Sequence, residues 1–431
     1  MADKQLYKYL PKLRFPEFKD KGEWETYTLE ELFEIRNGYT PSKSNPNFWD
    51  GGTIPWFRME DIRQNGHILS DSIQHITPAA VKGTGLFPAY SIIVATSATI
   101  GEHALLIADS LANQRFTFLT KRKSHDKQID MMFFHQYMFI IDEWCKKNTN
   151  SGGLLSVNMP AFKQLLIPLP SIKEQNAISS LLSSLDECIA ASKEKLEQLK
   201  AHKKGLMQKL FPASGKTLPE YRFKEFKNVW IEHALHDIGI FVKGLSYNSN
   251  DVTQDTSSTL VIRSTNIIPE QKVDCQNGLQ FVIKRPSDEQ ILQKGDVAIC
   301  LSNGSSNLVG KTSFFEGDYS GIATVGAFCG IYRSKVPITK YLVQTETYRK
   351  SIDLIKQGGN GALSNLYGND ILRLRFFLPA EEEQRKIASC LEQIDKMISL
   401  LGGKIDFLCL YKRGLLQQLF PSRIVSYVGT I

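Results

Sequence analysis

The segment LPSIKEQNAISSLLSSLDECIAASKEKLEQLKAHKKGLMQKLFP (169–212) is matched without gaps by LPAEEEQRKIASCLEQIDKMISLLGGKIDFLCLYKRGLLQQLFP (378–421). The two segments share their L-P start, the E-Q-x-x-I sequence that follows it and the L-F-P end. Asp186 recurs as Asp395, and Lys203 recurs as Lys412, at the same spacing of 209 residues. A gap-free match of this length indicates an internal duplication, and a duplication constrains the whole fold.

Apolar residues recur in steps of four and three along both segments, which predicts two long helices, each with a heptad seam. The first seam comprises Ile178, Leu182, Leu185, Ile189, Leu196, Leu199, Leu206 and Leu210, and the second comprises Ile387, Leu391, Ile394, Ile398, Leu401, Ile405, Leu408, Leu415 and Leu419. Lys203 and Lys412 interrupt the seams at the same register, either as polar register markers or as side chains that snorkel at the seam's edge. At a rise of ~1.5 Å per residue, each helix would be roughly 60 Å long.

Two repeats that each end in such a helix can close around a pseudo-two-fold axis, which makes the helices antiparallel. We therefore expect an antiparallel coiled coil with a globular block at each end. The alternative is that each amphipathic helix packs on a separate core. Circular continuity supports pairing, because the N-terminal YLPKLRFPEF (9–18) supplies the opening that TLPEYRFKEF (217–226) supplies after the first L-F-P.

The remaining segments are divergent copies of one another. They share an R-F-x-E-F-K sequence, and Trp24, Gly38 and Arg58 recur as Trp230, Gly244 and Arg263. Short strand-like runs alternate with helical stretches and with loops rich in Gly, Asn and Ser, which predicts mixed α/β domains and an α+β fold class. The predicted order is a first domain with the N-terminal segment (1–168), a spacer helix (169–212), a second domain (213–377), a second spacer helix (378–421) and a tail (422–431).

Composition is typical of a globular cytoplasmic protein of several domains. The 431 residues carry a formal net charge of +7, which permits an anionic partner. Seven cysteines without a C-x-x-C pair indicate reduced thiols. The N-terminus lacks the apolar core of a secretory signal, and no apolar run approaches the ~20 residues of a membrane span.

Motifs for catalysis or for a cofactor are missing from the sequence. SNGSSNLVGKT (302–312) resembles a phosphate-binding loop, but five residues separate Gly304 from Gly310 where the motif needs four. HALH (233–236) has no cysteine or acidic cluster nearby to complete a zinc site. The chain contains neither a G-x-S-x-G nucleophile elbow nor the N-P-P-[YF] motif of amino-methyltransferases. We therefore expect no catalytic residue, no metal ligand and no cofactor in this chain.

Four loops (37–52, 96–103, 243–251 and 302–311) are rich in hydroxyl, amide and cationic side chains, which can hydrogen-bond base edges and phosphates. Arginine can also contact guanine through two hydrogen bonds. The candidate DNA-binding residues are Ser42, Lys43, Arg58, Ser97, Arg115, Lys243, Asn248, Arg263, Asn303, Ser305 and Lys311. For each one the alternative is an ordinary solvated loop residue. Arg58 and Arg263, which match in the repeat, could instead share a structural or phosphate-binding role.

The chain resembles the DNA-specificity subunit of Type I restriction–modification enzymes over essentially its whole length. Four features carry the resemblance: the W-x-x-x-x-L openings (Trp24/Leu29 and Trp230/Leu235), I-P-L-P-S-I-K-E-Q-x-x-I (167–178), its counterpart F-L-P-A-E-E-E-Q-x-x-I (377–387), and both GL[ML]Q[KQ]LFP ends. The resemblance implies two target recognition domains, each reading one half of a bipartite, asymmetric sequence in double-stranded DNA. It also implies that the helices fix the length of the unread DNA between the two half-sites and bind two methyltransferase subunits. Restriction/translocase subunits would join this complex.

By the same resemblance this chain is non-catalytic, and S-adenosylmethionine, ATP and Mg are expected in the partner subunits. Methylation, translocation and cleavage would then belong to those subunits. The rival hypothesis is a coiled-coil scaffold whose end domains bind proteins. The two globular blocks have diverged, whereas the two helices have stayed alike. The repeat itself therefore favours two domains that recognise different DNA sequences and are held by one pair of helices.

Overall fold

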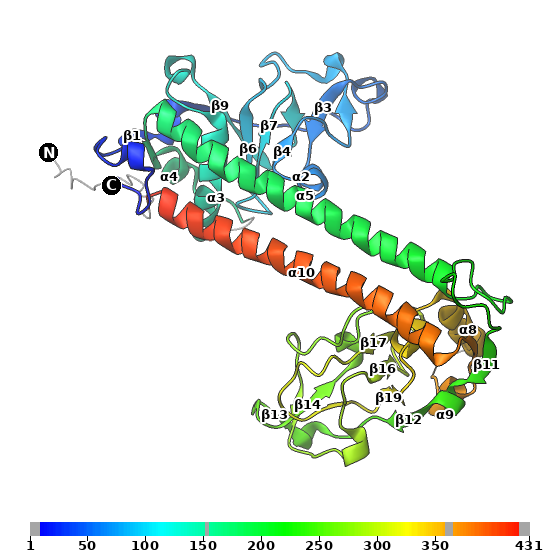
Figure 1. Cartoon of the computed structure of the whole chain (residues 1–431). Coiled ribbons are helices and arrows are strands. Elements are labelled where there is room, and N and C mark those ends of the chain that lie inside the picture. The colour runs from blue at the N-terminus through cyan, green and yellow to red at the C-terminus, as the bar shows by residue number, and fades with distance from the viewer. Residues whose placement is uncertain (1–8, 151–154, 358–364, 422–431) are drawn as a thin grey trace. The chain divides into compact units, whose positions relative to one another are not determined.

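The computed structural model describes residues 9–150, 155–357 and 365–421 (Figure 1). It divides into two compact units. The first unit comprises Met1–Lys193 and Gly403–Ile431, and the second comprises Glu194–Gly402. Each unit therefore combines one globular block with parts of both long helices. The predicted tail (422–431) lies outside the described residues, and the domain boundaries drawn from the sequence remain a prediction.

The two duplicated segments form the two longest helices, α5 (Ile172–Leu210) and α10 (Glu381–Leu419). Both have 39 residues, and both begin and end at positions that match in the repeat. At a rise of ~1.5 Å per residue, each is about 58 Å long. Helix α10 continues through Gly402 and Gly403, whose Cβ positions are open, so the glycines weaken it only by about 1 kcal/mol each through backbone entropy.

The helices pair antiparallel, as predicted. Asp186 of α5 pairs with Lys412 of α10, whereas Lys203, further along α5, pairs with Asp395, earlier along α10. In the first unit, the core that contains Ile178 and Leu182 also contains Leu415 and Leu419. In the second unit, Leu210, Ile387 and Leu391 share a core, and Leu206 packs against it. Every predicted seam residue is buried or half-buried.

The first unit contains a five-stranded sheet with the order β2-β9-β6-β7-β4 and a three-stranded sheet with the order β5-β3-β8. Their bounds are β2 (Phe33–Asn37), β3 (Ile54–Phe57), β4 (Ile68–Leu69), β5 (His75–Ile76), β6 (Ser91–Ala95), β7 (His103–Leu106), β8 (Leu111–Ala112) and β9 (Phe116–Lys121). The helices of this block are α1 (Leu29–Leu32), α2 (Met59–Asn65), α3 (Met131–Lys147) and α4 (Met159–Lys163).

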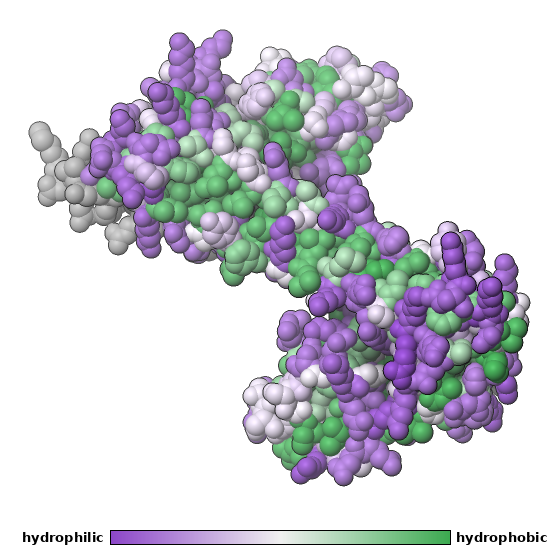
Figure 2. Space-filling view, in the orientation of Figure 1, coloured by the Kyte–Doolittle hydropathy of each residue, from purple (hydrophilic) through white to green (hydrophobic). Residues whose placement is uncertain are grey.

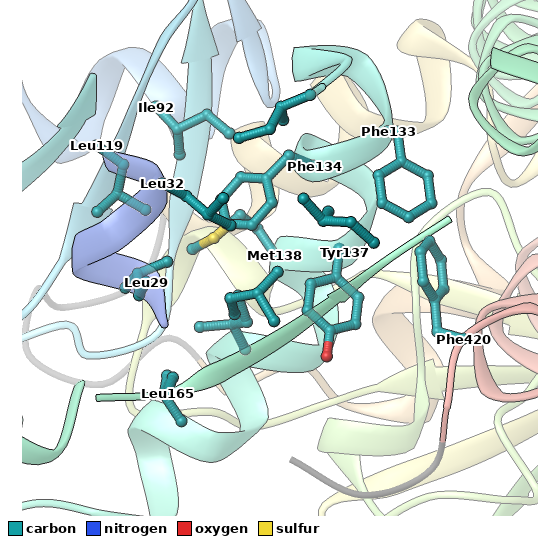
Figure 3. Packing of buried hydrophobic residues seen from close by; sticks show 14 of the residues in the cluster. Leu29, Leu32, Ile92, Leu119, Phe133, Phe134, Tyr137, Met138, Leu165 and Phe420 are labelled. Atoms are coloured by element: carbon teal, nitrogen blue, oxygen red, sulfur yellow. The ribbon is translucent and has the colours of Figure 1, made fainter. Parts of the chain in front are cut away.

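The central strands of the first unit are buried on both faces, because side chains alternate between two cores. Ile93 and Ala95 of β6 join the core shared with the smaller sheet. Ile92 and Val94 join the core formed with α3 and the long helices. Figure 3 shows this second core, where Phe420, just past α10, lies beside Phe133 and Tyr137 of α3.

The second unit repeats this plan with two four-stranded sheets, ordered β12-β19-β16-β17 and β13-β15-β14-β18. Their bounds are β12 (Gly239–Lys243), β13 (Val252–Thr253), β14 (Thr259–Ile262), β15 (Phe281–Val282), β16 (Val297–Cys300), β17 (Thr312–Phe314), β18 (Ala323–Val325) and β19 (Cys329–Ser334). Its helices are α6 (Leu235–Ile238), α7 (Thr339–Leu342), α8 (Glu346–Gln357) and α9 (Gly368–Leu372).

A short antiparallel pair of strands closes each globular block where its long helix begins. In the first unit, β1 (Glu25–Thr28) pairs with β10 (Leu166–Leu169). In the second, β11 (Ile231–Ala234) pairs with β20 (Arg375–Leu378). The start and the end of each block are therefore hydrogen-bonded together, which explains why the motifs around both are retained in the two copies.

An ion pair with a buried glutamate joins the R-F-x-E-F-K motif to the E-Q-x-x-I motif in each unit. Arg14 donates two hydrogen bonds to Glu174, both of 2.7 Å. Arg222 donates two to Glu383, of 2.7 and 2.8 Å. Two-point arginine–carboxylate pairs fix geometry as well as charge. These two repeated motifs thus contact each other, one in the segment that opens each block and the other in the first turn of the helix that follows it.

Candidate nucleic-acid interface

Four loops of the first unit meet at one end of its sheets. We define the first loop cluster as residues 38–45, 57–59, 96–98 and 112–116. The N–H of Gly38 donates to the C=O of Phe116 (2.9 Å), that of Asn113 to Phe57 (3.1 Å), and that of Thr96 to Arg115 (3.1 Å). A Cβ on Gly38 would lie 2.2 Å from the carbonyl oxygen of Ala112, so this close approach requires glycine.

Four loops of the second unit meet in the same way. We define the second loop cluster as residues 243–248, 262–266, 301–306 and 325–329. The N–H of Gly244 donates to Cys329 (3.2 Å), that of Gly326 to Ile262 (2.9 Å), and that of Leu301 to Phe328 (2.9 Å). A Cβ on Gly244 would lie 2.1 Å from the carbonyl oxygen of Gly326. The repeat-matched glycines, Gly38 and Gly244, therefore have one shared role, which is to let two loops approach closely.

The repeat-matched arginines occupy equivalent places in the two clusters. The N–H of Arg58 donates to Asp61 Oδ2 (2.6 Å), and that of Arg263 donates to Asn266 Oδ1 (3.1 Å), so each residue begins a helical turn. Arg263 Nη2 also donates to the C=O of Gly278 (2.8 Å). The Nε atom of each arginine is buried and finds no acceptor among the described residues. A buried donor without an acceptor is uncommon in proteins, but because these Nε atoms are out of reach of a ligand, only the outer guanidinium nitrogens of the two half-buried arginines are candidates for contact with a ligand oxygen.

The other candidates of the first unit lie within the first loop cluster. Ser42, Lys43 and Arg115 are exposed, and Ser97 is half-buried. Arg115 takes part in the cluster through its backbone, because its N–H donates to Asn113 Oδ1 at 3.0 Å and its C=O accepts from Thr96. The structure therefore gathers all five first-unit candidates, which are widely separated in the sequence, on one set of loops.

In the second loop cluster, the side-chain amides of both candidate asparagines already form hydrogen bonds within the protein. Asn303 Nδ2 donates to Ser264 Oγ (3.1 Å), and its Oδ1 accepts from the N–H of Ser305 (3.0 Å). Asn248 Oδ1 accepts from the N–H two residues further on (2.9 Å). These side chains hold the loops in shape, in keeping with the ordinary loop role that was the alternative for each residue. Lys243 and Ser305 are exposed.

Lys311 is placed differently from the other candidates. It is 9% exposed and lines a groove of about 1770 Å³ between the second globular block and the parts of α5 and α10 in that unit. Other lysines of this groove include Lys200, Lys204 and Lys340. A buried lysine in such a groove is poorly placed to contact base edges, although its charge still contributes to a positive field.

One exposed residue of the second loop cluster was missed by the sequence analysis. Phe328 is 71% exposed and lies in the turn between β18 and β19. No motif surrounds it, and sequence alone does not distinguish it from the apolar residues of the strand that follows. Large exposed aromatic side chains at a rigid loop commonly mark a contact site.

A cluster of ionisable groups is buried in the first unit between β7 and α3. His103 Nδ1 lies 2.5 Å from Asp142 Oδ2, and both ring nitrogens of His135 are buried without a partner among the described residues. Burial holds the pKa of His103 and of His135 well below the usual value, and burial raises the pKa of Asp142 to about 8. Among the described residues, no group of histidine, cysteine or acidic side chains has the arrangement of a metal site.

The exposed face of α10 carries apolar side chains in both units. Phe407, Leu410 and Tyr411 are exposed in the first unit, and Met397 and Leu400 are exposed in the second. In Figure 2, hydrophobic side chains gather over the C-terminal part of α10. The positions of α5 that match Phe407, Leu410 and Tyr411 in the repeat are the polar or small residues Gln198, Ala201 and His202. None of the described helices is both long and apolar enough to cross a membrane.

Comparison with known proteins agrees with this geometry. Residues 21–201 match a family model described as the Type I restriction modification DNA specificity domain. A stretch of 162 residues is 51% identical to the Type I restriction enzyme EcoprrI specificity subunit of Escherichia coli. That stretch covers 38% of this chain and 39% of the relative, so the match spans about two fifths of the relative's length.

Two solved structures share the fold over nearly the whole chain. The S subunit of a Type-I restriction-modification system from M. genitalium has a TM-score of 0.58 at 16% identity, covering 96% of this chain and 99% of that one. The second structure is described as the structural basis of complex assembly and conformational transition of the type I R-M system. It has a TM-score of 0.56 at 14% identity and covers 93% of this chain and 98% of that one. These comparisons show that residues 21–201 match the Type I restriction modification DNA specificity domain and that the chain shares its fold with the two solved structures.

Proposed function

We propose that this chain selects the DNA sequence on which a Type I restriction–modification complex acts, with each unit reading one half of a bipartite target. The observation that carries the proposal is the repeated loop cluster. The same four-loop arrangement is built twice around a repeat-matched glycine, Gly38 or Gly244, and a repeat-matched arginine, Arg58 or Arg263. The residues presented around these fixed points differ, so the two half-sites differ in sequence.

The chemistry of the clusters suits duplex DNA. Exposed Lys43, Arg115 and Lys243 offer cations for phosphates, and arginine can also read guanine in the major groove. A net charge of +7 for the whole chain is modest for a DNA-binding protein. Affinity would therefore depend on the partner subunits, which would supply further phosphate contacts. Two DNA-binding units joined by a rigid pair of helices would also bind with higher affinity, because binding by one unit raises the effective concentration of the other near its half-site.

The paired helices would fix the unread gap and dock the methyltransferase subunits. The apolar face of α10 in the first unit (Phe407, Leu410 and Tyr411) supports docking, because exposed apolar patches rimmed by polar residues commonly mark protein interfaces. S-adenosylmethionine, ATP and Mg would be bound by the partner subunits, and this chain would be non-catalytic. The competing function, a scaffold whose end domains bind proteins, shares the helices but predicts no DNA sequence preference.

The test is reconstitution of the chain with its methyltransferase subunit, followed by duplex binding at several salt concentrations and by mapping of the methylated sequence. We expect a bipartite, asymmetric methylated sequence and a binding constant that falls as salt rises. The double variant Phe407→Ser/Leu410→Ser should weaken assembly, whereas the matched α5 variant Gln198→Ser/Ala201→Ser should not. Sequence-independent methylation, or no DNA binding by the complex, would favour the scaffold.

A further inference from the structure

Phe328 occupies a rigid and exposed position in the second loop cluster. Its C=O accepts hydrogen bonds from the N–H of Leu301 (2.9 Å) and of Ser302 (3.2 Å). The next residue, Cys329, closes the turn by donating to the C=O of Gly326 at 2.8 Å. The backbone on both sides is thus fixed, while the side chain is 71% exposed. Exposure of a large apolar side chain to water is unfavourable in free energy, and contact with a partner would remove that penalty.

Phe328 is also the structural counterpart of Arg115 in the first unit. Ala95 at the end of β6 pairs with Phe116 at the start of β9, and Cys300 at the end of β16 pairs with Cys329 at the start of β19. One residue beyond these pairs, Thr96 donates to Arg115 and Leu301 donates to Phe328. The same place in the two clusters therefore presents a guanidinium in one unit and a phenyl ring in the other.

The difference between Arg115 and Phe328 changes which chemical group on a base edge this place in the cluster can recognise. A guanidinium at this place suits guanine, which offers two acceptors in the major groove, whereas a phenyl ring can make no hydrogen bond of that kind. The 5-methyl group of thymine is the apolar group that base edges present in the major groove, and phenylalanine is among the side chains that contact it. Other members of the second loop cluster, such as Arg263 and Asn303, are polar and form hydrogen bonds, whereas the Phe328 side chain is apolar.

We propose that Phe328 is a specificity-determining residue that contacts the 5-methyl group of a thymine in the half-site read by the second unit. The proposal rests on the proposed function, because it needs a sequence-specific duplex. It assigns to the second unit a preference for an A·T pair at one position. At the equivalent position of the half-site read by the first unit, Arg115 gives a preference for a polar base edge.

The test uses the complex of the full chain with its methyltransferase subunit and duplexes that carry the mapped target. Each thymine in turn is replaced by uracil, which removes only the methyl group, and the Kd is measured by fluorescence anisotropy at one salt concentration. For the wild-type complex we expect one position at which uracil raises Kd roughly fourfold, as the loss of one buried methyl group does. In Phe328→Ala the Kd for the unmodified target should rise, and uracil at that position should have no further effect. Leu354→Ala, which truncates another exposed apolar residue of the second unit (69% exposed), should leave the uracil profile unchanged.

The outcomes separate this proposal from the proposed function. If the wild-type complex binds its target specifically but its uracil profile is the same in Phe328→Ala, the role of Phe328 is refuted and the proposed function stands. A second-unit half-site without any A·T pair refutes it in the same way. If the wild-type complex has no sequence preference, both proposals fail. Phe328→Leu, which keeps an apolar side chain, should retain part of the response to uracil.

Discussion

Lys412 on α10 donates to both carboxylate oxygens of Asp186 on α5, at 2.6 and 2.7 Å. The same contact recurs in the second unit, where Lys203 Nζ lies 2.6 Å from Asp395 Oδ1. Each aspartate also accepts a hydrogen bond from its globular block. Gln136 Nε2 donates to Asp186, and the hydroxyl of Tyr341 donates to Asp395, both at 2.9 Å. In each unit, one carboxylate therefore joins the two helices and the globular block.

Replacing Lys412 with Met should destabilise the first unit, because Asp186 loses its partner in a partly buried site. The side chain of Lys412 is 11% exposed and that of Asp186 is 40% exposed, so we expect a loss of about 1–3 kcal/mol in the free energy of unfolding. Thermal or denaturant unfolding of the wild type and the variant measures the loss. Lys200→Met, which breaks the exposed pair with Glu197, is the matched control and should change stability by less than about 0.5 kcal/mol. Equal effects of the two variants would contradict a structural role for the partly buried pair.

Adding a methyl group at Gly38 or Gly244 should disrupt one loop cluster and leave the other intact. The new Cβ would meet backbone carbonyl oxygens at 2.2 and 2.1 Å, which no side-chain movement can relieve. Gly38→Ala should therefore reduce discrimination at one half of the target, and Gly244→Ala at the other, as read from methylation of duplexes altered in one half. The controls are Gly83→Ala in the first unit and Gly205→Ala on α5, both outside the loop clusters and with open Cβ positions. Loss of both halves in either variant would argue against independent clusters.

Between about pH 6.5 and 5.5, the buried histidines should lower the stability of the first unit as the pH falls, whereas Asp142, whose pKa burial raises to about 8, takes up a proton on folding and acts in the opposite direction. Burial holds the pKa of His135 well below its usual value, and His103, His67 and Lys412 nearby lower it further, while Asp186 raises it. In that range the unfolded chain binds protons that the folded histidines do not, so acidification favours unfolding. His135→Phe should reduce the pH slope by up to about 1.4 kcal/mol per pH unit, measured by denaturant unfolding at several pH values. His202→Gln, on an exposed position of α5, should leave the slope unchanged.

Much of the fold could be predicted from the sequence because a duplication fixes several features at once. The heptad spacing gave the long helices, and the matched ends of the repeat gave the antiparallel pairing. The roles of Asp186 and Asp395 could not be assigned, although both were visible as repeat matches. Their partners lie on the other helix, and the register that joins them depends on how the helices pair.

The candidate interface was harder to predict, because it depends on which loops meet. Residue type alone makes Arg115 a candidate, and only the hydrogen bonds between loops show that it lies with Arg58 in one cluster. Asn248 and Asn303 have a chemistry that suits base contacts, yet their amides hold turns within the protein. Phe328 has no chemical signal in the sequence, since an apolar residue next to a strand is ordinarily buried.

The central claim is that each unit reads one half of the target, and domain exchange tests it most directly. Residues 20–168 are replaced by the equivalent block of a Type I specificity subunit, and the hybrid is combined with the methyltransferase subunit. Methylated positions are then mapped on genomic DNA for the hybrid and the parent. The account predicts that one half of the methylated sequence changes, while the other half stays as in the parent. A hybrid that methylates a sequence altered in both halves, or the parental sequence unchanged, would contradict it.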